Sequence, residues 1–261
     1  MTNPNYLEIA RRSIEKFSLQ KSDYQILEAN KAFEIKKHPQ AKNIILTKDR
    51  ECQANFTIDF SKSKNCQLYL GKNIIGKIKI VFFGDNSTVY IGDNCKLNQL
   101  RIRSKQDNDF VAIGEGVTTG SNNIWTSGGG EGNSNPALIV GDDCMFAGDV
   151  VIRNSDAHPI FDLKSDLQIN MPNDIVHIEP HVWIGERVNI LKSVTVGTCS
   201  IVALGSVVTK NIPRFSIAKG VPAQATTKEN LYWARSYTDR AKYKAKYYIN
   251  KYKHLNSERS L

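Results

Sequence analysis

The sequence is poor in the features that mark membrane, secreted and disulfide-stabilised proteins. No window of its 261 residues approaches the roughly 18 consecutive apolar residues of a transmembrane helix. The opening stretch "MTNPNYLEIARRSIEKF" lacks the short apolar core of a secretory signal, so we expect a cytoplasmic location. The five cysteines are scattered without CxxC spacing. We therefore expect reduced thiols, and neither a disulfide framework nor a zinc ribbon.

Acidic residues are also in the minority. The chain has 35 Lys and Arg residues against 26 Asp and Glu residues, which gives a net charge of +9. A positive surplus favours acidic partners, but charge alone does not choose among nucleic acid, phosphates, anionic lipid and anionic polysaccharide. The hydrophobic fraction of 41% is that of a globular chain with a substantial core.

What the sequence has in abundance is a six-residue rhythm of aliphatic side chains. It is clearest at Ile178, Ile184, Ile190, Val196, Val202 and Val208. Shorter runs in other frames are Ile91-Leu97 and Val140-Phe146-Ile152. A period of six fits neither a helix nor a simple strand; it is typical of a parallel β-solenoid in which three hexads form one triangular coil. The sequence therefore predicts an all-β solenoid, with Cys95 and Cys144 packed in its core.

Two stretches interrupt this rhythm. The first, "TSGGGEGNSNP" at residues 126–136, is a glycine-rich loop, and no Lys-Ser or Lys-Thr follows it as a phosphate-binding loop requires. The second runs from about residue 155 to residue 175 and contains "SDAHPIFD". It shifts the hexad frame by two residues, so we expect it to project from the solenoid surface with His158.

The two ends of the chain follow helical patterns. Apolar residues at three- and four-residue spacing predict a short amphipathic helix within residues 5–20. A basic, tyrosine-rich segment predicts a second helix over residues 227–254, with Thr226 or Thr227 as its N-cap. We thus expect three parts: an N-terminal extension with a helix and the first strands (1–65), the solenoid (66–224) and a basic C-terminal helix (225–261).

The solenoid resembles a known family. The stretch "HVWIGERVNILKSVTVGTCSIVALGSVVTKNIPRFSIAKGVPAQ", residues 181–224, is similar to the C-terminal coils of hexapeptide-repeat acetyltransferases. The "SDAHPIFD" segment is similar to the histidine-bearing loop of the saccharide O-acetyltransferase branch, which includes enzymes that acetylate capsular and sialic acid polymers. The resemblance covers residues 140–224 best, residues 66–139 less well, and neither end of the chain.

The resemblance implies a left-handed parallel β-helix, an exception to the right-handed rule for parallel crossovers. It implies an enzyme, an O-acetyltransferase that uses acetyl-CoA and no metal and acts on a cell-surface or capsular saccharide or its precursor. It also implies a homotrimer with active sites between neighbouring prisms. Nucleic acid is not an expected partner, and association of the basic C-terminal helix with a membrane surface stays open.

His158 is the expected catalytic base. A hydroxyl must lose its proton as it attacks a thioester, and a neutral imidazole is suited to accept that proton near pH 7. Asp156, two residues earlier, could orient the imidazole or could form an Asx-turn with its own backbone. The resemblance places Trp183 beside the acetyl and acceptor groups, whereas an aromatic residue at a subunit seam is the alternative.

Residues that contact acetyl-CoA are expected in the last coils. The segment "ALGSVVTK" matches the family segment along which the pantetheine arm lies, and small residues there allow close approach of the ligand. Three cations of the overlapping stretch "TKNIPRFSIAKG" suit the phosphates of the nucleotide end. The expected cofactor-binding residues are Trp183, Gly185, Ala203, Leu204, Gly205, Thr209, Lys210, Arg214 and Lys219.

Two other functions compete with this interpretation. Hexapeptide-repeat carbonic anhydrases bind zinc through three histidines, and His158, His177 and His181 could be such a set, although the four-residue spacing of the last two is one short of that family's spacing. A non-catalytic β-helix that serves as a scaffold or binding subunit is the second alternative. It would not require His158, Trp183 and the "KGVPA" tail together.

Overall fold

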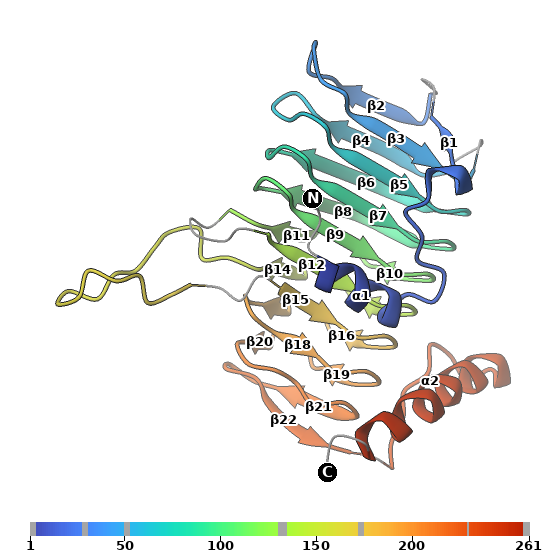
Figure 1. Ribbon diagram of the computed structural model, residues 1–261. Coiled ribbons are helices and arrows are strands. Elements are labelled where there is room, and N and C mark those ends of the chain that lie inside the picture. The colour runs from blue at the N-terminus through green and yellow to red at the C-terminus, as the bar shows by residue number, and fades with distance from the viewer. Residues whose placement is uncertain are drawn as a thin grey trace.

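The computed structural model describes residues 4–27, 31–49, 53–129, 135–171, 175–228 and 230–257. Within these ranges the chain winds as a solenoid of parallel strands with three faces (Figure 1). The two α-helices of the described residues lie outside the solenoid: α1 (Pro4–Ser13) lies against its front, and α2 (Asp239–Ser257) lies near its C-terminal end. Neither helix is long and apolar enough to cross a membrane.

We name the faces A, B and C in the order in which the chain crosses them. Face A is an eight-stranded sheet in the order β1 (Gln25–Ile26), β3 (Ile44–Thr47), β5 (Gln67–Leu70), β7 (Thr88–Ile91), β9 (Phe110–Ile113), β12 (Ala137–Val140), β15 (Ile175–Ile178) and β18 (Thr195–Val196). All neighbours in it are parallel except β1 and β3. A short 3-10 helix, Lys21–Asp23, precedes β1.

The second sheet bends to form the other two faces. Face B contains β10 (Thr118–Thr119), β13 (Met145–Phe146), β16 (Trp183–Ile184), β19 (Ile201–Val202) and β21 (Ser216–Lys219). Face C contains β2 (Phe33–Lys36), β4 (Asn55–Asp59), β11 (Asn123–Ser127), β14 (Val151–Arg153), β17 (Asn189–Ile190) and β20 (Val207–Val208). Two long strands, β6 (Ile75–Phe82) and β8 (Lys96–Ser104), pass around the B–C corner.

The hexad residues form the core, as the sequence predicted. Each of the six residues from Ile178 to Val208 in that rhythm is fully buried, and so are Val182 and Val188 at the fifth place of their hexads. Cys95 and Cys144 are buried in the same cluster. Burial of about 25 cal/mol per Å² of such apolar surface is the main stabilising contribution to a repeat of this kind.

The solenoid begins before residue 66. β2 already pairs in parallel with β4, and β3 with β5, so coils are stacked from about Phe33 onward. These first coils are longer than three hexads: Leu68 stands over Val89, 21 positions later, and Val89 over Val111, 22 positions later. A search for a strict period of six does not detect them, because their strands on face C are longer.

The N-terminal helix is present but ends earlier than its sequence pattern. α1 stops at Ser13, and Ala10 and Ile14 pack on the outer side of face A against Tyr90 and Ile139. Face A is therefore covered by α1 and by the chain that follows it, which leaves faces B and C to meet other molecules.

The prediction for the C-terminal helix is wrong at its start. Thr226 and Thr227, the expected N-caps, lie in β22 (Gln224–Thr227), which pairs antiparallel with β21. The helix begins only at Asp239, where the Thr238 hydroxyl accepts a hydrogen bond from the backbone N–H of Ala241. The pairing of β22 with the last coil satisfies backbone groups that helix formation at residue 227 would leave unpaired.

A column of glycines lines the A–B corner and allows the coils to stack. Gly71, Gly92, Gly114 and Gly141 lie one above the other. A Cβ on Gly114 would lie 2.5 Å from the Asp142 Oδ1 atom and 2.6 Å from the Asp142 backbone nitrogen. The corner therefore has no space for a side chain.

We expect Gly114→Ala to destabilise the protein by about 1–3 kcal/mol, because overpacking a close-packed site forces the backbone to shift. Gly148→Ala is the matched control, since its nearest non-neighbouring atom would be 3.3 Å away. Urea unfolding of both variants measures the difference. Equal losses of stability in the two variants would contradict this account of the corner.

Candidate active site

The insertion at the C–A corner carries His158 away from the solenoid. Val140 stands over Ile178, 38 positions later, whereas Ile178 stands over Val196, 18 positions later. The difference of 20 residues is the loop between β14 and β15, which projects far beyond the body in Figure 1. This loop lies where the frame shift predicted it.

Hydrogen bonds within the loop give it a defined shape. Its two arms are joined by an antiparallel bridge between Phe161 and Gln168 and by a 2.8 Å bond from the Ile169 N–H to the Ile160 carbonyl. The Asn170 side chain donates to the His158 carbonyl at 2.9 Å. The backbone of His158 is thus fixed, while its imidazole is exposed.

Asp156 anchors the loop instead of orienting the imidazole within the subunit. Its carboxylate accepts a 2.9 Å hydrogen bond from Asn170 and forms an ion pair with Lys192. Lys192 also donates to the Asn170 carbonyl at 2.7 Å. Slight burial opposes ionisation, but the bonds from Lys192 and Asn170 outweigh it and hold the pKa of Asp156 below its ordinary value.

Trp183 lies on a different side of the prism from His158. It stands on β16 of face B, with 38% of its surface exposed and its ring centroid 6.1 Å from that of Trp233. The loop that carries His158 leaves the solenoid at the corner between faces C and A, and this corner is opposite face B. One subunit therefore does not bring the two residues together.

Most of the expected cofactor residues gather on one corner. Gly185, Ala203, Leu204 and Gly205 lie at the B–C corner, directly after Trp183 and its partner strand β19. Lys219 follows there, because β21 pairs with β19. Leu204 is 71% exposed, and a Cβ on Gly205 would meet no atom within 4 Å. The corner thus offers an open backbone surface beside Trp183.

The other three expected cofactor residues lie elsewhere. Thr209 and Lys210 are exposed at the C–A corner. Arg214 lies at the A–B corner, where its guanidinium binds both carboxylate oxygens of Glu179 at 2.6 Å. The three expected cations, Lys210, Arg214 and Lys219, are therefore divided among three corners of the solenoid.

The histidines proposed as an alternative zinc set have other partners. His177 lies on face A, where its Nε2 atom is 2.7 Å from the Ser13 hydroxyl. Both ring nitrogens of His181 are occupied, one by the Asp143 carboxylate at 2.8 Å and one by the Trp233 carbonyl at 3.2 Å. Across the described ranges, no three potential metal-ligating side chains are grouped.

His181 is instead part of a cluster around the buried Asp143 carboxylate that fixes the C-terminal segment, and we call this cluster the C-terminal clamp. Its members are Asp143, His181, Trp233, Arg235, Lys244 and Tyr248. The His181 ring stacks between those of Trp233 and Tyr248, with centroid distances of 4.1 and 5.2 Å. Since Trp233 also flanks Trp183, the clamp sets one wall of the surface around Trp183.

The described cysteines are unsuited to act as nucleophiles. Cys66, Cys95, Cys144 and Cys199 are all buried and unbridged. Burial raises the pKa of the Cys95 and Cys199 thiols to about 12. Such thiols carry almost no thiolate near neutral pH. Cys52 lies outside the described residues.

Sequence reasoning missed the residues that hold the loop and the clamp. Lys192 and Asn170 meet Asp156 only through the fold, and no spacing in the chain indicates these contacts.

A basic surface on face C was also missed, although it has a signal in the sequence. "KIKI" at 77–80 and "RIR" at 101–103 alternate cations with isoleucines, which is the pattern of a strand with one face in the core.

Comparison with known sequences gives two informative relatives, while no family model matches the chain. A polysialic acid O-acetyltransferase of Neisseria meningitidis is 33% identical over 135 residues, which are 44% of this chain and 60% of that protein. A polysialic acid O-acetyltransferase of Escherichia coli O1:K1 is 41% identical over 104 residues, which are 40% of this chain and 33% of that protein. The matches thus span between one third and 60% of these relatives.

Solved structures extend the likeness over most of the fold. The crystal structure of the polysialic acid-specific acetyltransferase NeuO superimposes with a TM-score of 0.74 at 28% identity, over 87% of this chain and all of that chain. The polysialic acid O-acetyltransferase OatWY gives a TM-score of 0.56 at 23% identity, over 82% of this chain and 92% of that chain. The latter likeness concerns the fold alone.

The fold is therefore a left-handed parallel β-helix, as the family resemblance implied. The repeat, the coil geometry and the matched sequences agree: the chain is similar to hexapeptide-repeat acetyltransferases. Among the relatives of that class, it is similar to polysialic acid O-acetyltransferases.

Proposed function

We propose that the protein transfers an acetyl group from acetyl-CoA to a hydroxyl of an acidic capsular saccharide, with His158 as general base. The observation that carries this proposal is the 20-residue insertion, which holds the His158 backbone by hydrogen bonds and leaves the imidazole exposed. The solenoid core does not need this insertion, since its residues from Asp156 onward are largely exposed. The sialic acid polymers named for the relatives are the favoured class of acceptor.

The proposed reaction is a direct transfer. The neutral imidazole of His158 accepts the proton of the acceptor hydroxyl while the oxygen attacks the thioester carbon. A backbone N–H or the Trp183 N–H stabilises the oxyanion of the tetrahedral intermediate. The C–S bond then breaks, and the CoA sulfur takes the proton from the imidazolium. The buried thiols favour this route over an acetyl-enzyme.

We propose further that the active site is completed by a second copy in a homotrimer. His158 and the Trp183 surface lie on opposite sides of one prism, so a neighbour must supply one of them. The loop also exposes the apolar side chains of Ile160, Phe161, Leu163, Leu167, Ile169 and Met171. Monomeric proteins rarely expose such an apolar patch, and contact with another subunit would cover it.

Release of the CoA thiol tests the proposed function. We expect rapid acetyl-dependent release with a sialic acid polymer, weaker release with neutral sugars, and none with serine or chloramphenicol. Initial rates at varied concentrations of both substrates should give intersecting lines, as a ternary complex requires. Parallel lines, an isolable acetyl-enzyme or a preference for serine would refute the proposal.

A further inference from the structure

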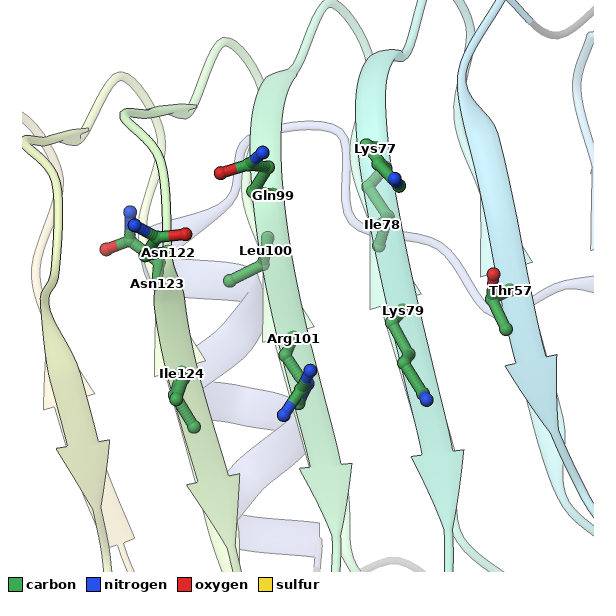
Figure 2. A pocket seen from close by; sticks show the side chains of 10 residues that line it. All are labelled: Thr57, Lys77, Ile78, Lys79, Gln99, Leu100, Arg101, Asn122, Asn123 and Ile124. Carbon is green, nitrogen blue, oxygen red and sulfur yellow. The ribbon is translucent and has the colours of Figure 1, made fainter.

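Face C has a groove lined by polar and basic side chains together with Ile78, Leu100 and Ile124. It has a volume of about 320 Å³ and crosses β4, β6, β8 and the start of β11 (Figure 2). The polar side chains in its lining are those of Thr57, Lys77, Lys79, Gln99, Arg101, Asn122 and Asn123. A second hollow of about 330 Å³ shares Lys79 and Arg101 with the first and adds Lys62 and Arg103. Together they form one cationic path, which we call the basic track.

The arrangement of cations in the basic track opposes folding stability. Lys79 stands directly beside Arg101 in the parallel pairing of β6 and β8, so two like charges are neighbours on the same face. Such pairs destabilise a sheet, and adjacent strands are only about 4.8 Å apart. The core on the opposite side of these strands does not need the charges, because Ile78, Ile80 and Ile102 fill it.

The cations of the basic track are available to a ligand. Within the described ranges, none of Lys77, Lys79, Arg101 and Arg103 forms an ion pair. The carboxylate of Asp59 lies near Lys79, but it accepts hydrogen bonds from the backbone and hydroxyl of Ser61. The positive charges on this face are therefore not balanced by an equal number of paired carboxylates among the described residues.

The basic track leads to the base of the catalytic loop. Arg103 on β8 is the register partner of Thr126 on β11, and Thr126 is the partner of Arg153 on β14. Two strand spacings, about 10 Å, separate the two arginines. Arg153 is the last residue of β14, and the loop with His158 follows it. A chain bound along face C would thus be guided toward His158.

We propose that the basic track binds an acidic polysaccharide. It would hold a long acceptor through sugars that are distant, along the same polymer, from the sugar that reacts. This rests on the proposed function. Guanidinium and ammonium groups bind carboxylates, while Thr57, Gln99 and Asn122 suit the hydroxyl groups of sugars. Single-stranded nucleic acid is disfavoured, because it requires exposed aromatic platforms. Among the residues that line the two hollows, one aromatic side chain, Phe83, is exposed, at 37%, and Lys62 and Lys105 lie over its ring at 6.0 and 4.9 Å, so the track has no row of aromatic platforms.

Direct binding is the first test. The variant is Lys79→Gln with Arg101→Gln, and the probes are a labelled sialic acid polymer, a neutral dextran and single-stranded DNA. We expect the wild-type protein to bind the acidic polymer with a strong salt dependence and the variant to bind it about tenfold more weakly, since two exposed ion pairs are lost. The control is Lys96→Ala. Lys96 is exposed and belongs to β8, like Arg101, but it lies on face B. Undiminished binding by the double variant, or tighter binding of DNA, overturns the proposal.

Kinetics separate this proposal from the proposed function. With a long acidic acceptor, the double variant should raise KM about tenfold and leave kcat unchanged. With a short acceptor that cannot reach the basic track, both constants should match the wild type. If the double variant loses activity equally with long and short acceptors, the proposed role of the basic track is wrong. If the wild type transfers no acetyl group but binds the polymer through Lys79 and Arg101, the proposed function fails and the track remains.

Stability provides a readout independent of any ligand. Because Lys79 and Arg101 repel each other, the double variant should unfold at the same temperature as the wild type or higher at low salt. A clear loss of stability would show that the two side chains serve the fold, and it would contradict the proposal.

Discussion

His158→Ala is expected to lose acetyl transfer by roughly 10²- to 10⁴-fold, the contribution of a positioned general base. The imidazole is exposed and the loop is held by the His158 backbone, not by its ring, so folding should be unaffected. The loss should therefore appear in kcat, with the KM for acetyl-CoA nearly unchanged. Thiol release under saturating acetyl-CoA measures it.

The matched control for His158 is His38→Ala. His38 lies in a loop between β2 and β3, and its Nδ1 atom accepts a 3.3 Å hydrogen bond from the Gln40 N–H. This variant should transfer acetyl groups at the wild-type rate. Full activity of His158→Ala would remove the general base from the proposed mechanism, and an equal loss in both variants would point to a general effect on folding.

Asp143→Asn is expected to cost about 3 kcal/mol of folding free energy, because it removes a buried charge that balances several donors. The side chain of Asp143 is only 2% exposed and binds His181, Arg235 and Lys244. Without its charge, Arg235 and Lys244 lose their common partner. The aromatic stack that places Trp233 beside Trp183 should loosen as well.

The stabilisation by Asp143 should depend on pH in a defined direction. Burial opposes ionisation, but His181, Arg235 and Lys244 outweigh it and lower the pKa of Asp143 to about 2. A lowered pKa in the folded state stabilises above the unfolded value of about 4, and this contribution is lost as pH falls toward about 2. The stability gap between wild type and Asp143→Asn should therefore be constant near neutral pH and close between about pH 4 and pH 2.

Asp149→Asn is the matched control for this experiment. Asp143 and Asp149 both have a backbone φ of 58°, a left-handed conformation that asparagine tolerates. Asp149 is exposed, so its substitution changes charge without removing a buried partner. Urea unfolding of both variants across the acid range gives the comparison. A loss of stability in Asp149→Asn equal to that in Asp143→Asn would contradict the role of the C-terminal clamp.

The repeat could be predicted from the sequence because each hexad position obeys a local rule. An aliphatic residue at Ile178 or Val196 must point inward in every coil, and the period alone reveals this. The frame shift likewise located the loop of His158. The start of the second helix could not be predicted, because residues 224–227 satisfy their backbone by pairing with β21, and local propensity contains no information about that partner.

The candidate site was only partly predictable for the same reason. Trp183, Gly185 and Ala203 come together because successive coils repeat the same corner, and a repeat can be counted along the chain. Asp156 meets Lys192 across 36 positions, and Asp143 meets Arg235 across 92, through contacts that no period describes. Side chains that hold the site are thus harder to find than those that line it.

The stacking of glycines at the A–B corner makes the solenoid modular. Coils meet there through the same close backbone contact from Gly71 to Gly141, while both long insertions lie at the C–A corner. A coil added at the N-terminal end could therefore stack on the existing coils through the same backbone contact. Each coil changes the length of face C by one strand spacing, about 4.8 Å. The number of coils thus sets the length of face C.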